Sequence, residues 1–267
     1  MNYPIIDCHC HVYPEKIAER AVENIGAFYN QKMTFDGKYS TLVKSMKENG
    51  ISHGIVFSVA TTPLQVHSIN CFIAETVKNS GGLLTGLGTL HPESETLRED
   101  VEEIIALGLK GVKLHPDFQK FRIDSPECER IYALCEGRLP VMLHTGDSRF
   151  DYSNPESVVP VLEKYKKLTV IGAHFGGWSC WKKAAEMLHK YENFYVDCSS
   201  TFHWLKTEEV EELIKIYSAD KVLFGTDFPM WSHENELKEF MKLSISDLDR
   251  KKIFYTNAVN VFSLENL

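Results

Sequence analysis

Eight short apolar runs recur along the chain at nearly regular intervals, and this repetition limits the possible folds more than any other feature. After a first interval of about 50 residues, the runs begin 25 to 29 residues apart. One buried strand and one crossover helix need about that much chain. We therefore interpret the runs as buried parallel strands. They are Ile5–His11, Gly54–Ala60, Leu83–His91, Gly111–His115, Pro140–His144, Thr169–His174, Phe194–Ser199 and Val222–Asp227.

The segments between the runs carry signals of helices. Ser125-Pro126 provides an N-cap and a first-turn proline, and Gly137 is suited to end the same helix. Thr207 begins another helix, followed by two glutamates that the helix dipole favours there. The first connection is long enough for two helices on either side of residues 30–37. Each strand thus has a helical partner in the sequence.

Uninterrupted strand–helix units predict an α/β fold. We expect one domain, residues 1–267, that forms a single (β/α)8 TIM-type barrel with its active site at the C-terminal ends of the strands. The alternative is an open doubly wound sheet. A dinucleotide-binding sheet has little support, because no G-x-G-x-x-G motif follows an early strand.

Charge and composition exclude several classes of partner. The formal net charge of −8 argues against nucleic acid, which needs a basic face. No apolar run approaches the ~18 residues of a membrane span, and residues 1–6 lack the pattern of a signal peptide. We expect a cytoplasmic protein whose seven cysteines are reduced thiols. Formation of a homo-oligomer stays open.

Polar side chains at the ends of the predicted strands carry the functional signal. Polar groups in buried strands are costly, so their positions are informative. The C-terminal ends of barrel strands meet at one mouth, and we expect five such side chains to gather there. Imidazole and carboxylate ligands suit Zn²⁺ or a neighbouring divalent metal. The five predicted metal ligands are His9, His11, His144, His174 and Asp227.

Other histidines and cysteines have simpler interpretations. His91 is expected to be a hydrogen-bonded structural residue. Strand alternation places Asp7, His9 and His11 on one face, and Cys8 and Cys10 on the other, so the two cysteines are predicted to be packing thiols and not zinc ligands. The remaining histidines are expected at the surface or in helix packing. They are His53, His67, His189, His203 and His233.

Ordered motifs on several strands give the chain a resemblance to the amidohydrolase superfamily, in the amidohydrolase-related branch that also contains metal-dependent decarboxylases. The similarity extends over nearly the whole chain. A lone H-x-H would be weak evidence, whereas the ordered set is specific. The motifs are Asp7-Cys8-His9-Cys10-His11, Gly111-Val112-Lys113-Leu114-His115-Pro116, His144-Thr145-Gly146, Ala173-His174-Phe175-Gly176-Gly177, Gly225-Thr226-Asp227-Phe228-Pro229 and Asn257-Ala258.

The resemblance implies roles for these residues. His9 and His11 would bind the metal, and His144 would be a further ligand. Asp227 would be a ligand or a proton shuttle, and His174 would bind the metal or orient a water molecule. Some members of the superfamily carry a carboxylated lysine between two metals. The context of Lys113 looks more like the mononuclear branch, so one ion is favoured over two, with Lys113 and His115 facing the substrate.

An open metal site predicts hydrolysis first. Zn²⁺ with a free position can lower the pKa of bound water to about 7. Asp227 would accept the water proton and His174 would stabilise the oxyanion. The expected substrate is a small carboxylic ester, lactone or amide. The alternative is non-hydrolytic decarboxylation of an aromatic or unsaturated acid, and the less favoured third hypothesis is a non-catalytic protein with a structural metal.

A substrate carboxylate would need cations, and the chain offers some beyond the strand ends. Arg122 and Arg149 lie just after the fourth and fifth strands, and with Lys113 they are candidates to hold it. A solvated surface arginine is an equal alternative for each. Trp178 and Trp231 follow the sixth and eighth strands and are predicted to form walls of the pocket, or else to pack between loop and helix.

Overall fold

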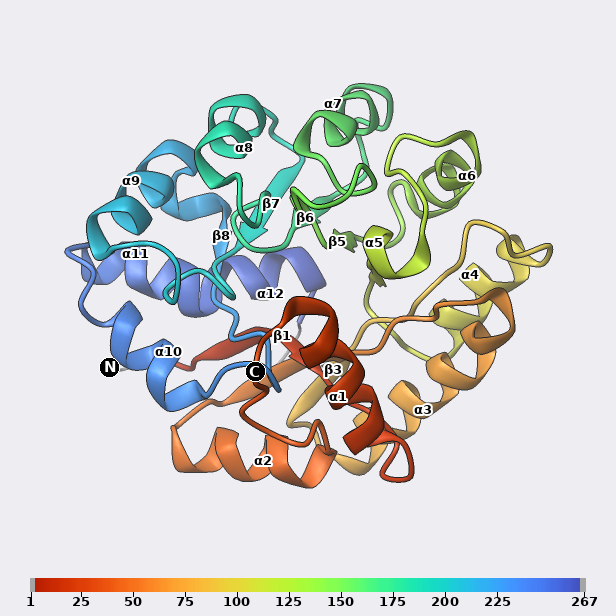
Figure 1. Cartoon of the computed structure of the whole chain (residues 1–267), viewed down its shortest axis with the longest axis horizontal. Helices are drawn as coiled ribbons and strands as arrows, with labels where there is room; N and C mark the ends of the chain where they lie inside the picture. The colour runs from red at the N-terminus through yellow and green to blue at the C-terminus, as the bar shows by residue number, and fades with distance from the viewer. Residues whose placement is uncertain (1–2, 265–267) are drawn as a thin grey trace.

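A computed structural model describes residues 3–264 and contains eight parallel strands in sequence order around a common centre (Figure 1). Hydrogen bonds between neighbouring strands form one sheet in the order β1-β2-β3 and a second in the order β4-β5-β6-β7-β8. The strands are β1 Ile6–His11, β2 His53–Phe57, β3 Leu84–Gly86, β4 Val112–Leu114, β5 Val141–Leu143, β6 Val170–Gly172, β7 Phe194–Asp197 and β8 Val222–Leu223. The strand order is the one predicted from the spacing.

Backbone hydrogen bonds at two seams close these sheets into one barrel. Between β3 and β4, the amide of Lys113 donates to the carbonyl of Gly88 at 2.8 Å. Between β8 and β1, the amide of Cys8 donates to the carbonyl of Phe224 at 2.8 Å. The (β/α)8 prediction is therefore confirmed.

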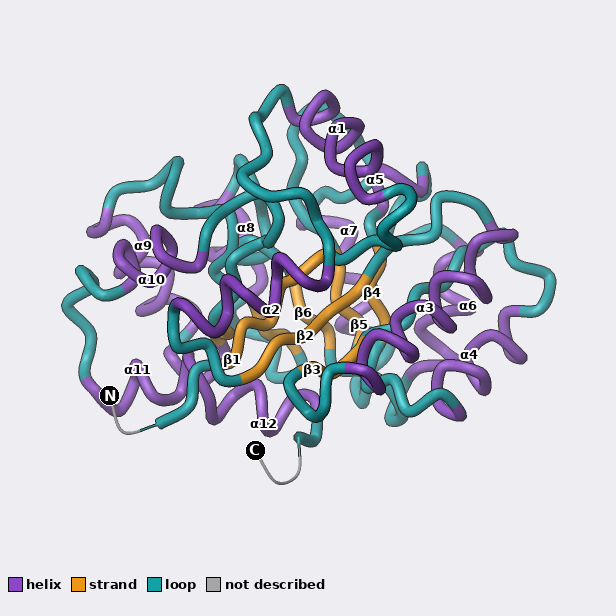
Figure 2. The backbone as a smooth tube through the Cα atoms, turned by 90° about the horizontal axis from the view of Figure 1, so that it is seen from below, coloured by secondary structure: helices purple, strands orange, loops and turns teal. Residues whose placement is uncertain are grey.

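Helices surround the barrel and cover both of its ends. Figure 2 shows α1 and α5 above the C-terminal ends of the strands and α12 at the opposite end. The predicted cap is present, since Ser125 Oγ accepts a hydrogen bond from the Cys128 amide at 3.3 Å. The α-helices are α1 Ala18–Tyr29, α2 Tyr39–Glu48, α3 Val66–Asn79, α4 Leu97–Ala106, α5 Pro116–Gln119, α6 Pro126–Cys135, α7 Pro155–Lys164, α8 Trp181–Leu188, α9 Thr207–Tyr217, α10 His233–Phe240, α11 Asp247–Lys251 and α12 Asn257–Phe262. Short helices of other types are η1 Pro63–Gln65, η2 Ala219–Lys221 and η3 Lys252–Thr256.

The lower half of the barrel interior is apolar. Side chains from six strands or their ends fill it, and Ala258 and Phe262 of α12 pack against them from below. A packed apolar interior leaves the opposite end of the barrel for polar chemistry. The strand residues of this inner cluster are Ile6, Cys8, Ile55, Phe57, Leu87, Met142, Ile171 and Leu223.

An irregularity in β1 changes which side chains point inward. The pairing of β1 with β2 shifts between Asp7 and Cys10, where β1 has one residue more than β2. Cys8 therefore packs inside the barrel, whereas Cys10 belongs to the outer cluster. The prediction from simple alternation is wrong for Asp7 and Cys8, because a β-bulge inserts an unpaired residue and re-aims its neighbours. Through the bulge, His9 and His11 still reach the mouth.

Asp7 faces outward into a buried ion pair. Its Oδ2 lies 3.0 Å from Nε2 of His233, at the start of α10. His233 Nδ1 in turn contacts Ser45 Oγ of α2 at 2.8 Å. Burial opposes ionisation of Asp7, but His233 and the hydroxyl of Thr226 outweigh it and hold the pKa of the carboxyl below its usual value. His233 is thus a fully buried link among three elements.

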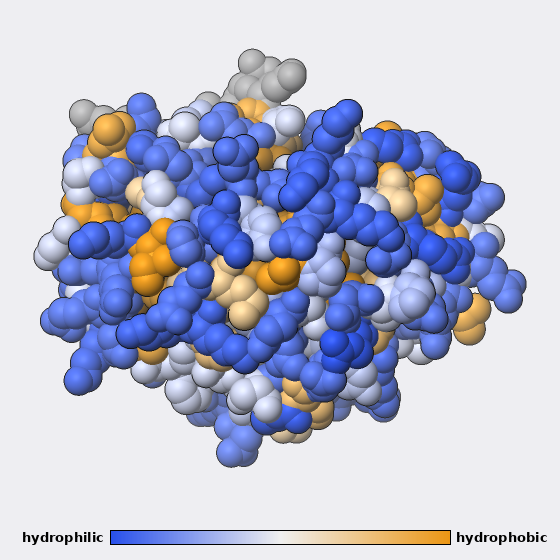
Figure 3. Space-filling model, turned by 90° about the horizontal axis from the view of Figure 1, so that it is seen from above, coloured by the Kyte–Doolittle hydropathy of each residue, from blue (hydrophilic) through white to orange (hydrophobic). Residues whose placement is uncertain are grey.

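The outer surface of the helices is mostly polar on one face of the molecule. The face over α7 and α8 is mainly hydrophilic, and its hydrophobic residues are scattered (Figure 3). None of the helices within residues 3–264 is long and apolar enough to cross a membrane. All seven cysteines lie in the described part of the chain, and no disulfide joins them.

Candidate active site

A cavity of about 960 Å³ opens at the C-terminal ends of the strands. Its base is formed by side chains from β1 and from the segments that follow β4, β5, β6 and β8. Helix α1, in the β1–β2 connection, forms one wall, and α3 contributes to another. A concave site at this end of a barrel is where ligands normally bind.

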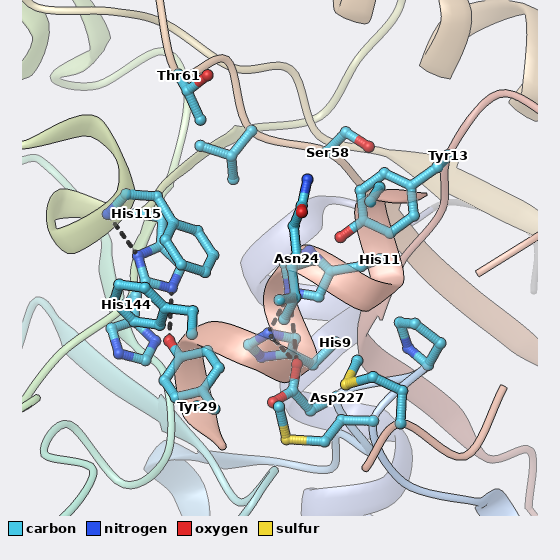
Figure 4. Close-up of a pocket in the computed structure, with 18 of the residues that line it drawn as sticks. His9, His11, Tyr13, Asn24, Tyr29, Ser58, Thr61, His115, His144 and Asp227 are labelled. Carbon is cyan, nitrogen blue, oxygen red and sulfur yellow. Dashed lines mark hydrogen bonds and ion pairs between the residues drawn. The ribbon is translucent and has the colours of Figure 1, made fainter. Parts of the chain in front are cut away.

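Two histidines and one carboxylate converge at the base of the cavity (Figure 4). The Nε2 atoms of His9 and His11 are 3.2 Å apart. Asp227 Oδ1 lies 3.3 Å from the first and 3.4 Å from the second. Three potential ligand atoms so close together form a donor set that a single divalent cation can bind.

Asp197 orients His9 from behind. His9 Nδ1 lies 2.9 Å from Asp197 Oδ2, so this nitrogen carries the proton and Nε2 presents its lone pair to the centre. Burial raises the pKa of the Asp197 carboxyl, but His9 and His174 outweigh burial and hold the pKa well below its usual range. Sequence reasoning missed Asp197, although it ends β7 as the other site residues end their strands.

His174 and His144 form a second contact at the base. His174 Nε2 is 3.2 Å from His144 Nδ1, and the rings of His174 and His9 stack with centroids 5.1 Å apart. His174 Nδ1 meets the carbonyl of Ser199 at 3.1 Å. His174 has a φ of +58° and Asp227 a φ of +63°. Both are left-handed conformations that non-glycine residues adopt at some cost, and they are frequent at functional sites.

Burial determines the protonation of the site. It lowers the pKa of both His11 and His174 to about 4, even though Asp227 opposes it. For Asp227, burial opposes ionisation, but His9, His174 and His11 outweigh it and hold the pKa well below its usual range. Neutral imidazoles beside an ionised carboxylate are the forms that bind a metal.

Lys113 lies beside the base of the cavity without lining it. Its side chain is fully buried, with Nζ 3.5 Å from His9 Nε2 and 5.0 Å from the centre of the Phe57 ring. Burial lowers its pKa to about 8, against the attraction of Asp197 and Asp227. The structure thus brings Lys113 close to the histidine cluster.

His115 lies in a stack of rings at one side of the base. It is parallel to His144, with centroids 4.0 Å apart, and stacks on Phe118 at 3.9 Å. Its Nε2 is 2.9 Å from the hydroxyl of Tyr29, which α1 contributes from above. Burial lowers the pKa of His115 well below its ordinary value. Tyr29 was not predicted, because nothing in the sequence links the first connection to the strand ends.

Asp117 faces His144 from the side away from His174. Asp117 Oδ2 lies 3.7 Å from His144 Nε2, and burial raises the pKa of its carboxyl to about 6. His115 belongs to the same group of potential ligands. Its ring is parallel to that of His144, so one ion cannot lie in both ring planes, and this group is less suited to a metal.

The structure does not bring the two predicted arginines to the cavity. Arg122 is engaged by Asp124 and Asp151. Arg149 donates to both carboxylate oxygens of Asp147, and its Nη1 donates to the carbonyl of Phe28 at 2.7 Å. Both guanidinium groups are thus paired with carboxylates of the protein itself. Among the described lining residues, the one Lys or Arg side chain is Lys120.

The tryptophans divide between lining and support. Trp178 lines the cavity, as predicted, and Trp204 does so as well, although no sequence signal pointed to it. Trp231 is buried and does not line the cavity. Its Nε1 donates to Ser200 Oγ at 2.8 Å, and Ser200 Oγ donates to Asp227 Oδ2 at 2.5 Å. Trp231 therefore supports the site through Ser200.

A family model places the chain among known proteins. The model described as Amidohydrolase matches residues 6–264, so the protein belongs to the amidohydrolase family. A gamma-resorcylate decarboxylase from Polaromonas sp. is 32% identical over 123 residues, covering 39% of this chain and 37% of that relative. One from Rhodococcus jostii is 35% identical over 74 residues, covering 28% and 22%. These matches span well under half the length of the curated relatives.

Solved structures show the same fold over the whole chain. An uncharacterized TIM-barrel protein from Bordetella bronchiseptica has a TM-score of 0.83 at 20% identity, over 98% of this chain and 99% of that one. A dihydroxybenzoic acid decarboxylase from Polaromonas sp. JS666, with bound manganese and the inhibitor 2-nitroresorcinol, has a TM-score of 0.75 at 20% identity, over 100% and 98%.

Proposed function

We propose that the protein is a metal-dependent decarboxylase of an aromatic acid. The observation that carries the proposal is the convergence of His9, His11 and Asp227 at the base of a large cavity. The partial match to gamma-resorcylate decarboxylases supports decarboxylation ahead of hydrolysis, which the sequence motifs alone had placed first.

The donor set fits one divalent cation. His9 Nε2, His11 Nε2 and Asp227 Oδ1 would hold it. His174, whose ring stacks on that of His9, and His144, which contacts His174, would be further ligands or partners of the substrate. Zinc and manganese both accept nitrogen and carboxylate ligands, and a structural relative contains manganese. A bound cation would supply a Lewis acid that polarises the oxygens of the substrate.

Decarboxylation requires a proton at the carbon that loses CO₂. The bond between the ring carbon and the carboxylate carbon breaks, the electron pair stays on the ring, and a proton takes the vacated position. We assign the transfer of this proton to Asp227, the one carboxylate that lines the cavity among the described residues. Its low pKa means that it is ionised at rest, so it accepts a proton from solvent before delivering it. Ser200 Oγ fixes the orientation of the carboxylate.

Hydrolysis would use the same residues as decarboxylation, with His9, His11 and Asp227 at the metal. Asp227 would then take a proton from water, and the substrate would be a small carboxylic ester, lactone or amide. Water incorporation separates the two reactions, because decarboxylation adds no oxygen to the product.

The test is turnover of 2,6-dihydroxybenzoate by protein loaded with Mn²⁺ or Zn²⁺. We expect release of CO₂ with no ¹⁸O in the aromatic product when the reaction runs in H₂¹⁸O. The variant Asp227→Asn should lose at least about 100-fold in kcat, the scale typical of proton-transfer groups.

The matched control is Asp151→Asn, which removes a carboxylate whose side chain is 75% exposed. It should leave the rate of CO₂ release unchanged. Metal content of each variant is measured by mass spectrometry, so that loss of the ion is separated from loss of the proton carrier. Hydrolysis of a lactone or ester panel without any CO₂ from aromatic acids would overturn the proposal.

A further inference from the structure

We propose that the substrate acid carries an extended apolar substituent, alkyl or aryl, that lies along α1 beyond the histidine cluster. This inference rests on the proposed function and specifies its substrate class. An apolar cavity of about 150 Å³ accommodates one benzene ring. The cavity here measures about 960 Å³, several times the space that a single substituted ring needs.

Helix α1 presents an apolar stripe to the cavity. Ala21, Ile25 and Phe28 follow one another at intervals of four and three residues, so they share one face of the helix, and all three line the cavity. A different face, with Val22 and Gly26, is buried against the protein. The helix therefore has two apolar faces: one packs against the protein, and the other lines the cavity.

Other elements continue this apolar wall. Ile69 and Phe72 of α3 line the cavity, and Trp178 and Trp204 line it from the segments after β6 and β7. Trp204 is 54% exposed, although a side chain of this size is usually more buried. Large exposed apolar side chains that border a cavity are typical of a ligand-binding surface.

Among the described residues that line the cavity, the charged side chains are few: Asp227 at the base, and Lys120. Asp227 and the histidines form the base of the cavity, and α1 adds Tyr29 and Asn24 as polar groups that point inward (Figure 4). Apart from Lys120, the described lining residues offer no Lys or Arg that could hold a second anionic group. A ligand that matches this distribution has one acidic, oxygen-rich end and an uncharged body.

The test measures binding separately from turnover. The probes are 2-nitroresorcinols that carry hydrogen, methyl, propyl or hexyl at C5; the nitro group cannot leave as CO₂. Their dissociation constants are measured by calorimetry with metal-loaded protein. Burial of one methylene tightens binding up to about fourfold. With about twofold realised per methylene, the six methylenes of the hexyl compound should make it bind roughly 60-fold more tightly than the parent.

A matched pair of variants locates the substituent. Ala21→Phe fills the stripe and should bring the affinity of the hexyl compound to within about threefold of the affinity of the parent compound for the same variant. Ala27→Phe places the same side chain on the exposed face of the same helix, and should keep the full dependence on chain length. Circular dichroism confirms that both variants are folded.

The outcomes separate the two proposals. Two results would overturn the proposal of an apolar substituent, even if 2,6-dihydroxybenzoate releases CO₂. One is an affinity that does not depend on the length of the alkyl chain. The other is a dependence on chain length that is the same in Ala21→Phe and Ala27→Phe. Chain-length dependence that Ala21→Phe alone abolishes supports the proposal, even if no acid is decarboxylated, in which case the proposed reaction falls and the binding site stands.

Discussion

At the scale of single residues, two imidazoles of the site are each held by a hydrogen bond at Nδ1, which leaves Nε2 free to face the other site residues. His9 is held by Asp197, and His174 by the carbonyl of Ser199. Because each support fixes the tautomer, the lone pairs that can bind a metal are set before any ion arrives. The buried carboxyl groups differ in their pKa: those of Asp197 and Asp227 lie below the usual range, whereas that of Glu236 is raised.

Glu236 is a fully buried carboxyl on α10. His203 Nε2 lies 3.0 Å from its Oε1, whereas Oε2 has no hydrogen-bond partner within the described chain. Burial raises its pKa from 4.5 to about 7, against the attraction of His203. Between these pH values the folded chain retains a proton that the unfolded chain has lost. The free energy of unfolding therefore falls as pH rises through this range, and the full penalty applies above pH 7.

Replacing Glu236 with Gln removes this penalty. We expect the variant to be more stable than wild type by roughly 1–3 kcal/mol at pH 8, with the difference shrinking toward pH 5. Urea denaturation across pH 5 to 8.5 measures it. Glu234→Gln, an exposed residue of the same helix, serves as the control and should show little difference at any pH. A stability gain that is constant with pH would contradict the assignment.

At the scale of elements, α1 is tied to the barrel at its C-terminal end. Arg149 donates to the carbonyl of Phe28 at 2.7 Å while both oxygens of Asp147 hold its guanidinium. Its Cζ lies 4.7 Å from the centre of the Phe28 ring. Helix carbonyls at this end lack partners within the helix, and an arginine satisfies them well. Arg149, predicted as a substrate ligand, thus positions the helix that lines the cavity.

Arg149→Ala should loosen α1. Loss of one hydrogen bond of about 1 kcal/mol corresponds to roughly fivefold faster opening. Hydrogen–deuterium exchange of residues 18–29, read by mass spectrometry, is the measurement. Arg122→Ala, which breaks comparable ion pairs away from α1, should leave exchange in α1 unchanged. Equal exchange in α1 for both variants and wild type would show that other contacts hold the helix.

Sequence reasoning reached the barrel and the strand-end histidines because both depend on local pattern. Regular spacing sets the number of strands, and a polar residue that ends an apolar run is visible in one dimension. The bulge at Cys8 and the contact of Tyr29 with His115 are different, since each depends on how distant segments meet in space. The charge state of Arg149 was evident, but its partner, a backbone carbonyl of α1, carries no signature in the sequence.

At the scale of the whole molecule, the barrel separates stability from chemistry along its axis. The lower interior is filled by apolar side chains, with Phe262 of α12 packed beneath them at 1% exposure. The upper interior holds the polar cluster and the cavity. Strain at His174 and Asp227 can be tolerated because the packing that stabilises the fold lies elsewhere.

Phe262→Ala tests this separation. Truncating a buried phenylalanine should lower the free energy of unfolding by about 3–5 kcal/mol, measured by urea denaturation. The metal stoichiometry of the folded variant should stay at that of wild type. Phe150→Ala, at a side chain that is 36% exposed, should cost far less stability. A loss of metal together with stability in Phe262→Ala would show that the two halves are coupled.

Helix α1 stands apart from this ring of strands. The β1–β2 connection already has α2 as its crossover, so α1 is an addition, and the closing hydrogen bonds of the barrel do not run through it. Substitutions on the cavity face of α1 can therefore change which ligands fit, while the hydrogen bonds that close the barrel stay in place.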